Sequence, residues 1–176
     1  MLVWQSGASL YWRRYHEQND FDLLVASVNT GPAVLMLRQW RASLQLSSDY
    51  LTLGGRALGW FNGVTPSITW QFDNGELNLE GEYTHRTYNR DIDEGREGDF
   101  GAAGVTLGRY FNNRKAAATL GARAVLFNAD DDQYGYAGGQ LTAGFSSESW
   151  PNGTFYTRGR YSDLYYEGDE PLFGKE

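Results

Sequence analysis

Hydrophobic and polar residues alternate along much of this chain. Between Glu76 and Tyr83 the odd positions carry Leu, Leu, Gly and Tyr, whereas the even positions carry Glu, Asn, Glu and Glu. The same period of two runs through 40–47, 60–72 and 116–126. Successive strand residues point to opposite faces of a sheet, whereas a helix spaces its apolar residues by three and four. The pattern therefore predicts β-strands with one apolar and one polar face.

Short turns and longer polar connections alternate between the predicted strands. Asp73-Asn74-Gly75 is typical of the short turns, because Asn and Gly tolerate positive φ, as tight hairpins require. Longer connections are predicted at 16–20, 49–56, 89–99, 129–133 and 163–176. The nine strands are predicted near 3–15, 21–36, 40–50, 57–72, 76–88, 100–111, 115–128, 134–147 and 154–166. This order predicts an all-β chain that forms an antiparallel up-and-down sheet.

The length of these strands favours a membrane protein. Most contain 11 to 16 residues, about twice the five or six that are usual in soluble sheets. Twelve residues at about 3.4 Å each, tilted by about 45°, cover roughly 29 Å, close to the thickness of a bilayer's hydrocarbon core. We therefore expect a transmembrane β-barrel. Nine is an odd number and bacterial single-chain barrels close with an even one, so an incomplete barrel is expected.

The domain organisation follows from the same pattern. Residues 1–176 are predicted to form a single β-barrel domain. The first residues contain no basic region followed by an apolar stretch, so no secretion signal is predicted there. We expect the chain to be an internal fragment of a longer protein.

Aromatic residues, which make up 15% of the chain, gather near the predicted strand ends. Aliphatic residues fill the apolar faces between them, as in a barrel whose aromatic girdles lie at the two membrane interfaces. The alternative is that aromatic residues simply favour strands. Tyr88 and Phe100 are counted among the aromatic residues near the long connections. The candidates for the girdle itself are Trp40, Trp60, Trp70, Tyr83, Trp150 and Tyr161.

Charged residues lie in mid-strand on the face opposite the apolar one. Unpaired charge is costly to bury, so this face is either wet or internally paired. In a barrel it would line the lumen, as a conduction or export path or as an ion-paired filling, and the pattern leaves both open. The candidates for the lumen lining are Arg41, Glu80, Glu82, Arg123, Arg158 and Arg160.

Composition removes several other classes of function. Fifteen Lys and Arg against 22 Asp and Glu give a net charge of -7, which argues against nucleic acid as a partner. The chain has no cysteine, and its two histidines, His16 and His85, are interpreted as ordinary residues at the rim. No motif of an enzyme is present, so we expect no catalytic residue, cofactor or metal site. The acidic connections lack the spacing of a calcium-binding EF-hand and are interpreted as solvated loops.

Several short motifs along the chain share one resemblance. They are Arg14-Tyr15 with Asp20-Phe21-Asp22-Leu23-Leu24, Gly31-Pro32 with Trp40, Leu53-Gly54-Gly55-Arg56-Ala57, Asn128-Ala129-Asp130 and Leu172-Phe173-Gly174-Lys175. Together they resemble the C-terminal outer-membrane barrel of one family, the surface lipoprotein assembly modifiers or Slam proteins. In that family a periplasmic helical-repeat domain precedes the barrel, and further strands would follow the last one predicted here. The resemblance implies that this chain lacks both.

The functional hypothesis combines the pattern with this resemblance. We expect a segment of a bacterial outer-membrane β-barrel that helps to translocate surface lipoproteins or related protein cargo to the cell surface. Its partners would be outer-membrane lipid and that cargo. One alternative is a passive or exopolysaccharide-export pore, which shares the same physical features. Another is a soluble ligand-binding β-barrel, in which the apolar face would point inward instead.

Overall fold

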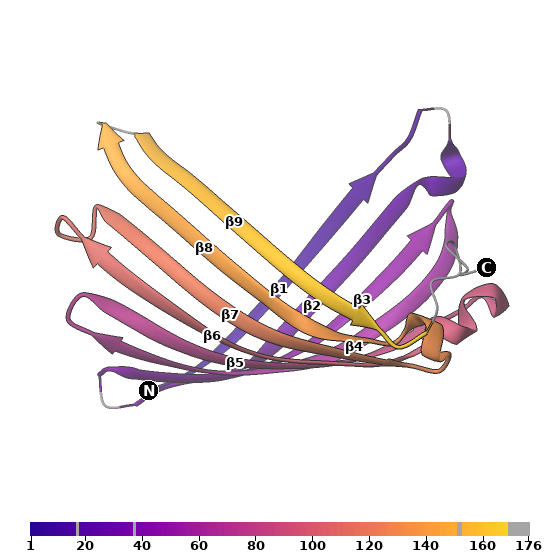
Figure 1. The fold of residues 1–176 in the computed structure, drawn as a ribbon, viewed down its shortest axis with the longest axis horizontal. Helices are drawn as coiled ribbons and strands as arrows, with labels where there is room; N and C mark the ends of the chain where they lie inside the picture. The colour runs from indigo at the N-terminus through magenta and orange to yellow at the C-terminus, as the bar shows by residue number, and fades with distance from the viewer. Residues whose placement is uncertain (17, 37, 151–152, 169–176) are drawn as a thin grey trace.

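One antiparallel sheet forms the molecule. The computed structural model describes residues 1–16, 18–36, 38–150 and 153–168, and of residues 149 and 150 it describes the backbone alone. Its nine strands follow one another in chain order, each antiparallel to the next (Figure 1). They are β1 (Leu2–Arg13), β2 (Leu23–Met36), β3 (Trp40–Leu53), β4 (Arg56–Phe72), β5 (Gly75–Tyr88), β6 (Gly98–Phe111), β7 (Ala116–Ala129), β8 (Tyr136–Trp150) and β9 (Gly153–Tyr166). The predicted up-and-down sheet of nine long strands is confirmed, with 12 to 17 residues in each strand.

The sheet is curved but not closed, and β1 and β9 are its two edges. Tight turns lie at one end of the trough. The other end carries the tight turn between β3 and β4 and three 3₁₀ helices, at Asn19–Phe21, Asp91–Arg96 and Asp132–Tyr134 (Figure 1). All three fall within the predicted long connections or at their edges. Within the described ranges no helix is both long and apolar enough to cross a membrane.

Two predictions about the connections are wrong. The predicted connection 49–56 is instead a tight turn, because β3 continues to Leu53 and β4 begins at Arg56. Gly54 and Gly55 adopt φ values of 59° and 74°, and two consecutive residues with positive φ reverse a chain without a longer loop. The sequence also suggested that the tight turn before Gly75 would have positive φ at Asn74. Asn74 does not adopt positive φ, whereas Arg38 and Asn113, in two other tight turns, do. The predicted connection 163–176 begins too early, because β9 continues to Tyr166, and residues 169–176 lie outside the described part.

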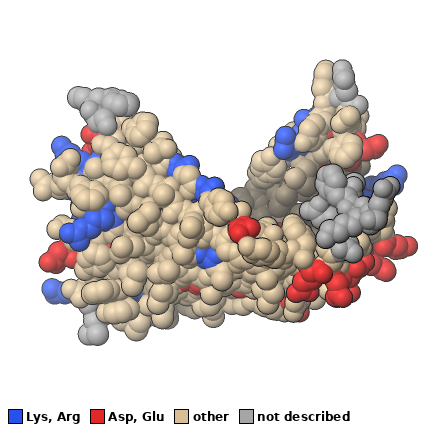
Figure 2. All heavy atoms as spheres, in the orientation of Figure 1, with Lys and Arg blue, Asp and Glu red and all other residues tan. Residues whose placement is uncertain are grey.

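The polar face is the concave face of the trough. Glycines on this face are crowded: a Cβ added at Gly121 would lie 2.6 Å from Thr142 Oγ1, and one at Gly144 would lie 2.6 Å from Thr119 Oγ1. On the apolar face, a Cβ at Gly101 or Gly159 would meet no atom within 4 Å. Side chains converge on the inside of a curved sheet and diverge on the outside. Figure 2 shows the hollow that the concave face encloses between the two wings of the sheet.

The apolar face is convex and exposed. Leu79 in β5 is 50% exposed and Leu120 in β7 is 63% exposed. The sequence left open which face points inward, and the structure turns the aliphatic face outward.

A small cluster of buried residues lies on the concave face near the end that carries the 3₁₀ helices. Phe100, Val125 and Phe127 form it, and Phe127 is only 3% exposed. The Arg86 guanidinium stacks on the rings of Phe100 and Phe127, with its central carbon 4.9 Å and 4.6 Å from their centroids. Aromatic side chains therefore close part of the concave face at this end, and a cation covers them.

The crowding of the concave face predicts the effect of adding a single methyl group. Gly121→Ala would place a Cβ between Thr142 Oγ1 and Thr106 Oγ1, at 2.6 and 3.1 Å. We expect this substitution to lower the free energy of unfolding by about 1–3 kcal/mol, because overpacking forces side chains from their preferred rotamers. Urea unfolding followed by tryptophan fluorescence measures the change. Gly101→Ala is the matched control on the convex face and should be neutral, so an equal loss in both variants would contradict the assignment of the two faces.

Candidate functional site

The concave polar surface is the candidate site, and β3, β5, β7 and β9 supply its charges. The register aligns Glu80, Gly104, Arg123 and Gln140 in one row across β5 to β8. The next row contains Arg41, Thr69, Asn78, Thr106, Gly121, Thr142 and Arg160. Arg158 and Glu82 lie on the same face, one row further out on either side. The structure thus brings all six candidates for the lumen lining onto one face.

One ion pair crosses this surface. Arg123 Nη2 on β7 donates to Glu82 Oε2 on β5, so the pair bridges the intervening strand β6. Gly104 lies beside Arg123 on β6, and a Cβ there would lie 3.4 Å from Arg123 Cβ and Cγ. The pair therefore depends on curvature and on the missing side chain between the partners. Both side chains keep about a third of their exposure, at 32% and 31%.

The other four of the six candidates are exposed. Among the described residues, no opposite charge lies within 4.0 Å of Arg41, Glu80, Arg158 or Arg160. Among the six candidates, both acidic residues lie on β5, and the four basic residues lie on β3, β7 and β9. Of the two possibilities that the sequence left open, the ion-paired filling describes Glu82 and Arg123, whereas the wet surface describes the remainder.

The convex face carries the aromatic candidates. The Trp40 and Trp70 rings stack with centroids 5.8 Å apart near the tight turns, and those of Tyr50 and Trp60 lie 4.7 Å apart near the opposite end. Tyr83 and Tyr161 are closer to the strand middles, each five residues before the last residue of its strand (88 − 83 and 166 − 161). The side chain of Trp150 lies outside the described part of the structure.

Two aromatic residues that the sequence placed near the long connections lie on the other face. Tyr88 and Phe100 belong to the concave face, and Phe100 is buried in the cluster under Arg86. Both residues lie near a strand end, as a girdle residue would. They are even-numbered, however, and the even-numbered side chains of β5 and β6 point to the concave face. The prediction considered nearness to the strand end without the face, and was wrong for these two.

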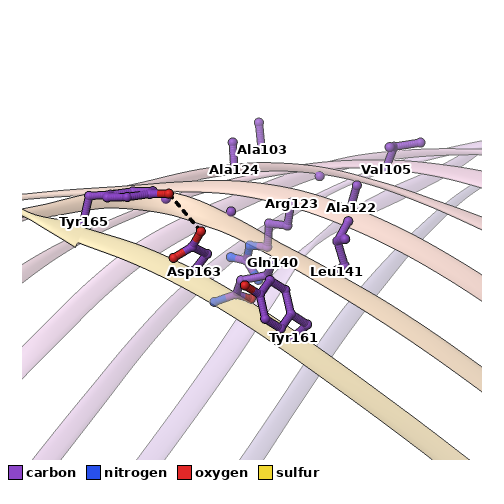
Figure 3. A pocket seen from close by; sticks show the side chains of 13 residues that line it. Ala103, Val105, Ala122, Arg123, Ala124, Gln140, Leu141, Tyr161, Asp163 and Tyr165 are labelled. Carbon is purple, nitrogen blue, oxygen red and sulfur yellow. Dashed lines mark hydrogen bonds between the residues drawn. The ribbon is translucent and has the colours of Figure 1, made fainter.

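A shallow apolar groove crosses the convex face over β6 to β9. Ala103, Ala122 and Ala124 line it together with Tyr161 and Tyr165, and Tyr165 donates a hydrogen bond of 2.9 Å to Asp163 (Figure 3). Small residues on adjacent strands leave this depression in an otherwise aliphatic surface.

The acidic connections are more ordered than the sequence indicated. Figure 2 shows acidic side chains gathered at the end of the trough that carries the 3₁₀ helices. Asp93 is buried there, with Arg96 Nη1 donating to its Oδ1 at 3.3 Å. Arg90 Nε lies 3.0 Å from Asp93 Oδ2, an ion pair whose angle is not that of a hydrogen bond. The interpretation as a solvated loop is wrong for Asp93, because local arginines neutralise it.

Neighbouring connections also bind one another through the backbone. Asp130 N donates to Glu97 O at 2.8 Å, and Asp131 N donates to Gly95 O at 3.0 Å. Within the described ranges, no group of three or more His, Cys, Asp or Glu residues could hold a metal ion.

His85 belongs to a polar cluster that the sequence did not reveal. Its Nδ1 lies 2.8 Å from Asp99 Oδ1, and Tyr83 donates its hydroxyl to the same oxygen at 2.7 Å. All three lie on the convex face, because β5 and β6 place residues 83, 85 and 99 on one side of the sheet. Only the strand register could have shown this, since Asp99 falls within a predicted connection.

Comparisons with known proteins add no relative: no family model, no curated protein and no solved structure matches this chain.

Removing one partner of the ion pair tests its contribution. Glu82→Gln leaves the Arg123 guanidinium without its carboxylate, and we expect the free energy of unfolding to fall by about 1 kcal/mol. Glu80→Gln is the matched control on the same strand and face, and should change it by less than about 0.5 kcal/mol. Urea titration at low and high salt measures both, and the difference between the variants should shrink as salt screens the pair. Equal losses in both variants would contradict a specific pair.

Proposed function

We propose that this chain forms part of the wall of an outer-membrane β-barrel, through which protein cargo such as surface lipoproteins reaches the cell surface. One observation carries the membrane part of the proposal: the convex face is aliphatic and exposed, whereas the concave face is polar. A bilayer removes the exposed aliphatic surface from water, and a water-filled lumen keeps the charges hydrated. Strands of 12 to 17 residues are long enough for this arrangement.

The soluble alternative agrees less well with the geometry. A soluble barrel that binds a ligand inside requires an apolar interior and a polar exterior, the reverse of the curvature found here. In water the convex face would expose a contiguous apolar patch that includes Leu44, Ile68, Leu79 and Leu120. Patches of this kind normally mark contact with a membrane or with another protein.

The cargo part of the proposal has a different support. It depends on the short motifs that resemble surface lipoprotein assembly modifiers, of which Leu53-Gly54-Gly55-Arg56 forms the tight turn between β3 and β4. The wet charges of Glu80, Arg158 and Arg160 agree with a passage for polar cargo, and they agree equally with a pore for solutes or polysaccharide. An experiment on the cargo, rather than on the barrel, is therefore needed to distinguish protein translocation from a pore for solutes or polysaccharide.

Cysteine accessibility along β5 tests membrane insertion. The chain has no cysteine of its own, so single cysteines at positions 77 to 82 report one site each. In cells that make the protein, we expect a water-soluble thiol reagent to label positions 78, 80 and 82 and to spare 77, 79 and 81, because lipid covers the convex face. Labelling in detergent provides the control for reactivity. Uniform labelling, or the opposite alternation, would overturn the proposal.

Deleting the gene tests the cargo. We expect lipoproteins to disappear from the surface of intact cells, measured by antibody binding and protease shaving, while their total amount in the cell is unchanged. Restoring the gene should restore display. Intact display combined with a loss of solute or polysaccharide passage would overturn the translocation part and favour the pore.

A further inference from the structure

Three arginines line one cavity of the concave surface. Arg123, Arg158 and Arg160 surround a space of about 210 Å³ together with Gln140 and Thr142. At roughly 30 Å³ for each water molecule in the liquid, this space corresponds to about seven waters. A small hydrated group therefore fits in this cavity, which residues of β5 to β9 line.

The cavity is basic on this side. Arg123 already pairs with Glu82, whereas Arg158 and Arg160 have no carboxylate within 4.0 Å among the described residues. Glu80 also lines the cavity, but it belongs to β5, on the side opposite β9. Because the positive charges of Arg158 and Arg160 are separated from the negative charge of Glu80, an anion is attracted towards β9 and repelled from β5.

Strand geometry presents the two free arginines together. Arg158 and Arg160 are two residues apart on β9, so both side chains leave the same face about 7 Å apart. The neighbour of Arg158 on β8 is Gly144, and Gly121 on β7 lies next to Thr142 in the row of Arg160. The space beside each glycine is occupied by a hydroxyl, Thr119 Oγ1 at Gly144 and Thr142 Oγ1 at Gly121, each 2.6 Å from the position of an added Cβ. Thr142 also lines the cavity.

The donors match the acceptors of an oxyanion. A guanidinium presents planar pairs of N–H groups, and the Thr142 hydroxyl and the Gln140 amide add further donors. Tetrahedral oxyanions of the phosphate type offer several oxygens to such convergent donors. We propose that Arg158 and Arg160, with Thr142 and Gln140, form a binding site for a phosphate group.

This inference uses the concave surface that the proposed function also uses, but binding can be measured without a membrane passage. The folded protein is titrated calorimetrically with sodium phosphate at constant ionic strength, and separately with glycerophosphoethanolamine, which presents the phosphate of a lipid headgroup. Arg158→Gln and Arg160→Gln should each weaken binding about tenfold, because each removes charge-assisted hydrogen bonds. Arg41→Gln, on the same face but on β3, is the matched control and should bind normally.

The outcomes distinguish the source of the phosphate group. Binding of inorganic phosphate identifies a free or terminal phosphate as the ligand, and binding of the diester alone identifies a lipid headgroup. Absence of binding by both, or equal weakening by the Arg41 variant, overturns the site. Circular dichroism of each variant excludes unfolding as the cause of a loss. Failure of the cysteine labelling leaves this result unaffected, so the two proposals fail separately.

Discussion

Steric crowding on the concave face is the constraint on which the rest of this structure depends. A strongly curved sheet brings the side chains of its inner face together, and here those side chains are charged or hydroxylic. Glycines relieve the crowding at Gly104, Gly121 and Gly144, each directly opposite a polar side chain on a neighbouring strand. Without them the sheet would have to flatten. The outer face needs no such relief, and it carries leucine, valine and alanine instead.

Strand direction adds a second constraint, at the edges. Successive strands are antiparallel, so β1 and β9 run in the same direction. If β1 and β9 paired directly, the pairing would be parallel. A closed sheet in which every pair of neighbours is antiparallel would need an odd number of additional strands between β9 and β1. Neither edge contains the proline or lysine that commonly protects an edge strand from pairing. Both edges therefore retain the ability to pair along their length.

The sequence predicted most of this fold for a simple physical reason. Parity along a strand is a local property, so the sequence alone assigns the residues between Glu76 and Tyr83 to the correct faces. The pairing register of the strands and the backbone conformation of the turns are harder to predict from neighbouring residues. The pattern did not show that Gly54 and Gly55 replace a longer loop, because that depends on positive φ at both. It also misplaced Phe100, whose nearness to a strand end suggested a girdle while its parity placed it in the buried cluster.

The sequence likewise predicted one part of the candidate site and not the other. Its six charged residues share a face because of parity, and the sequence was sufficient to group them. The pairing of Glu82 with Arg123 could not be predicted, since the partners are two strands apart and meet only because the sheet bends between them. Arg158 and Arg160 lie on the outermost strand, where no further strand supplies a partner among the described residues. The bend of the sheet brings Glu82 and Arg123 together across β6, whereas Arg158 and Arg160 at the edge keep their charge available to a ligand.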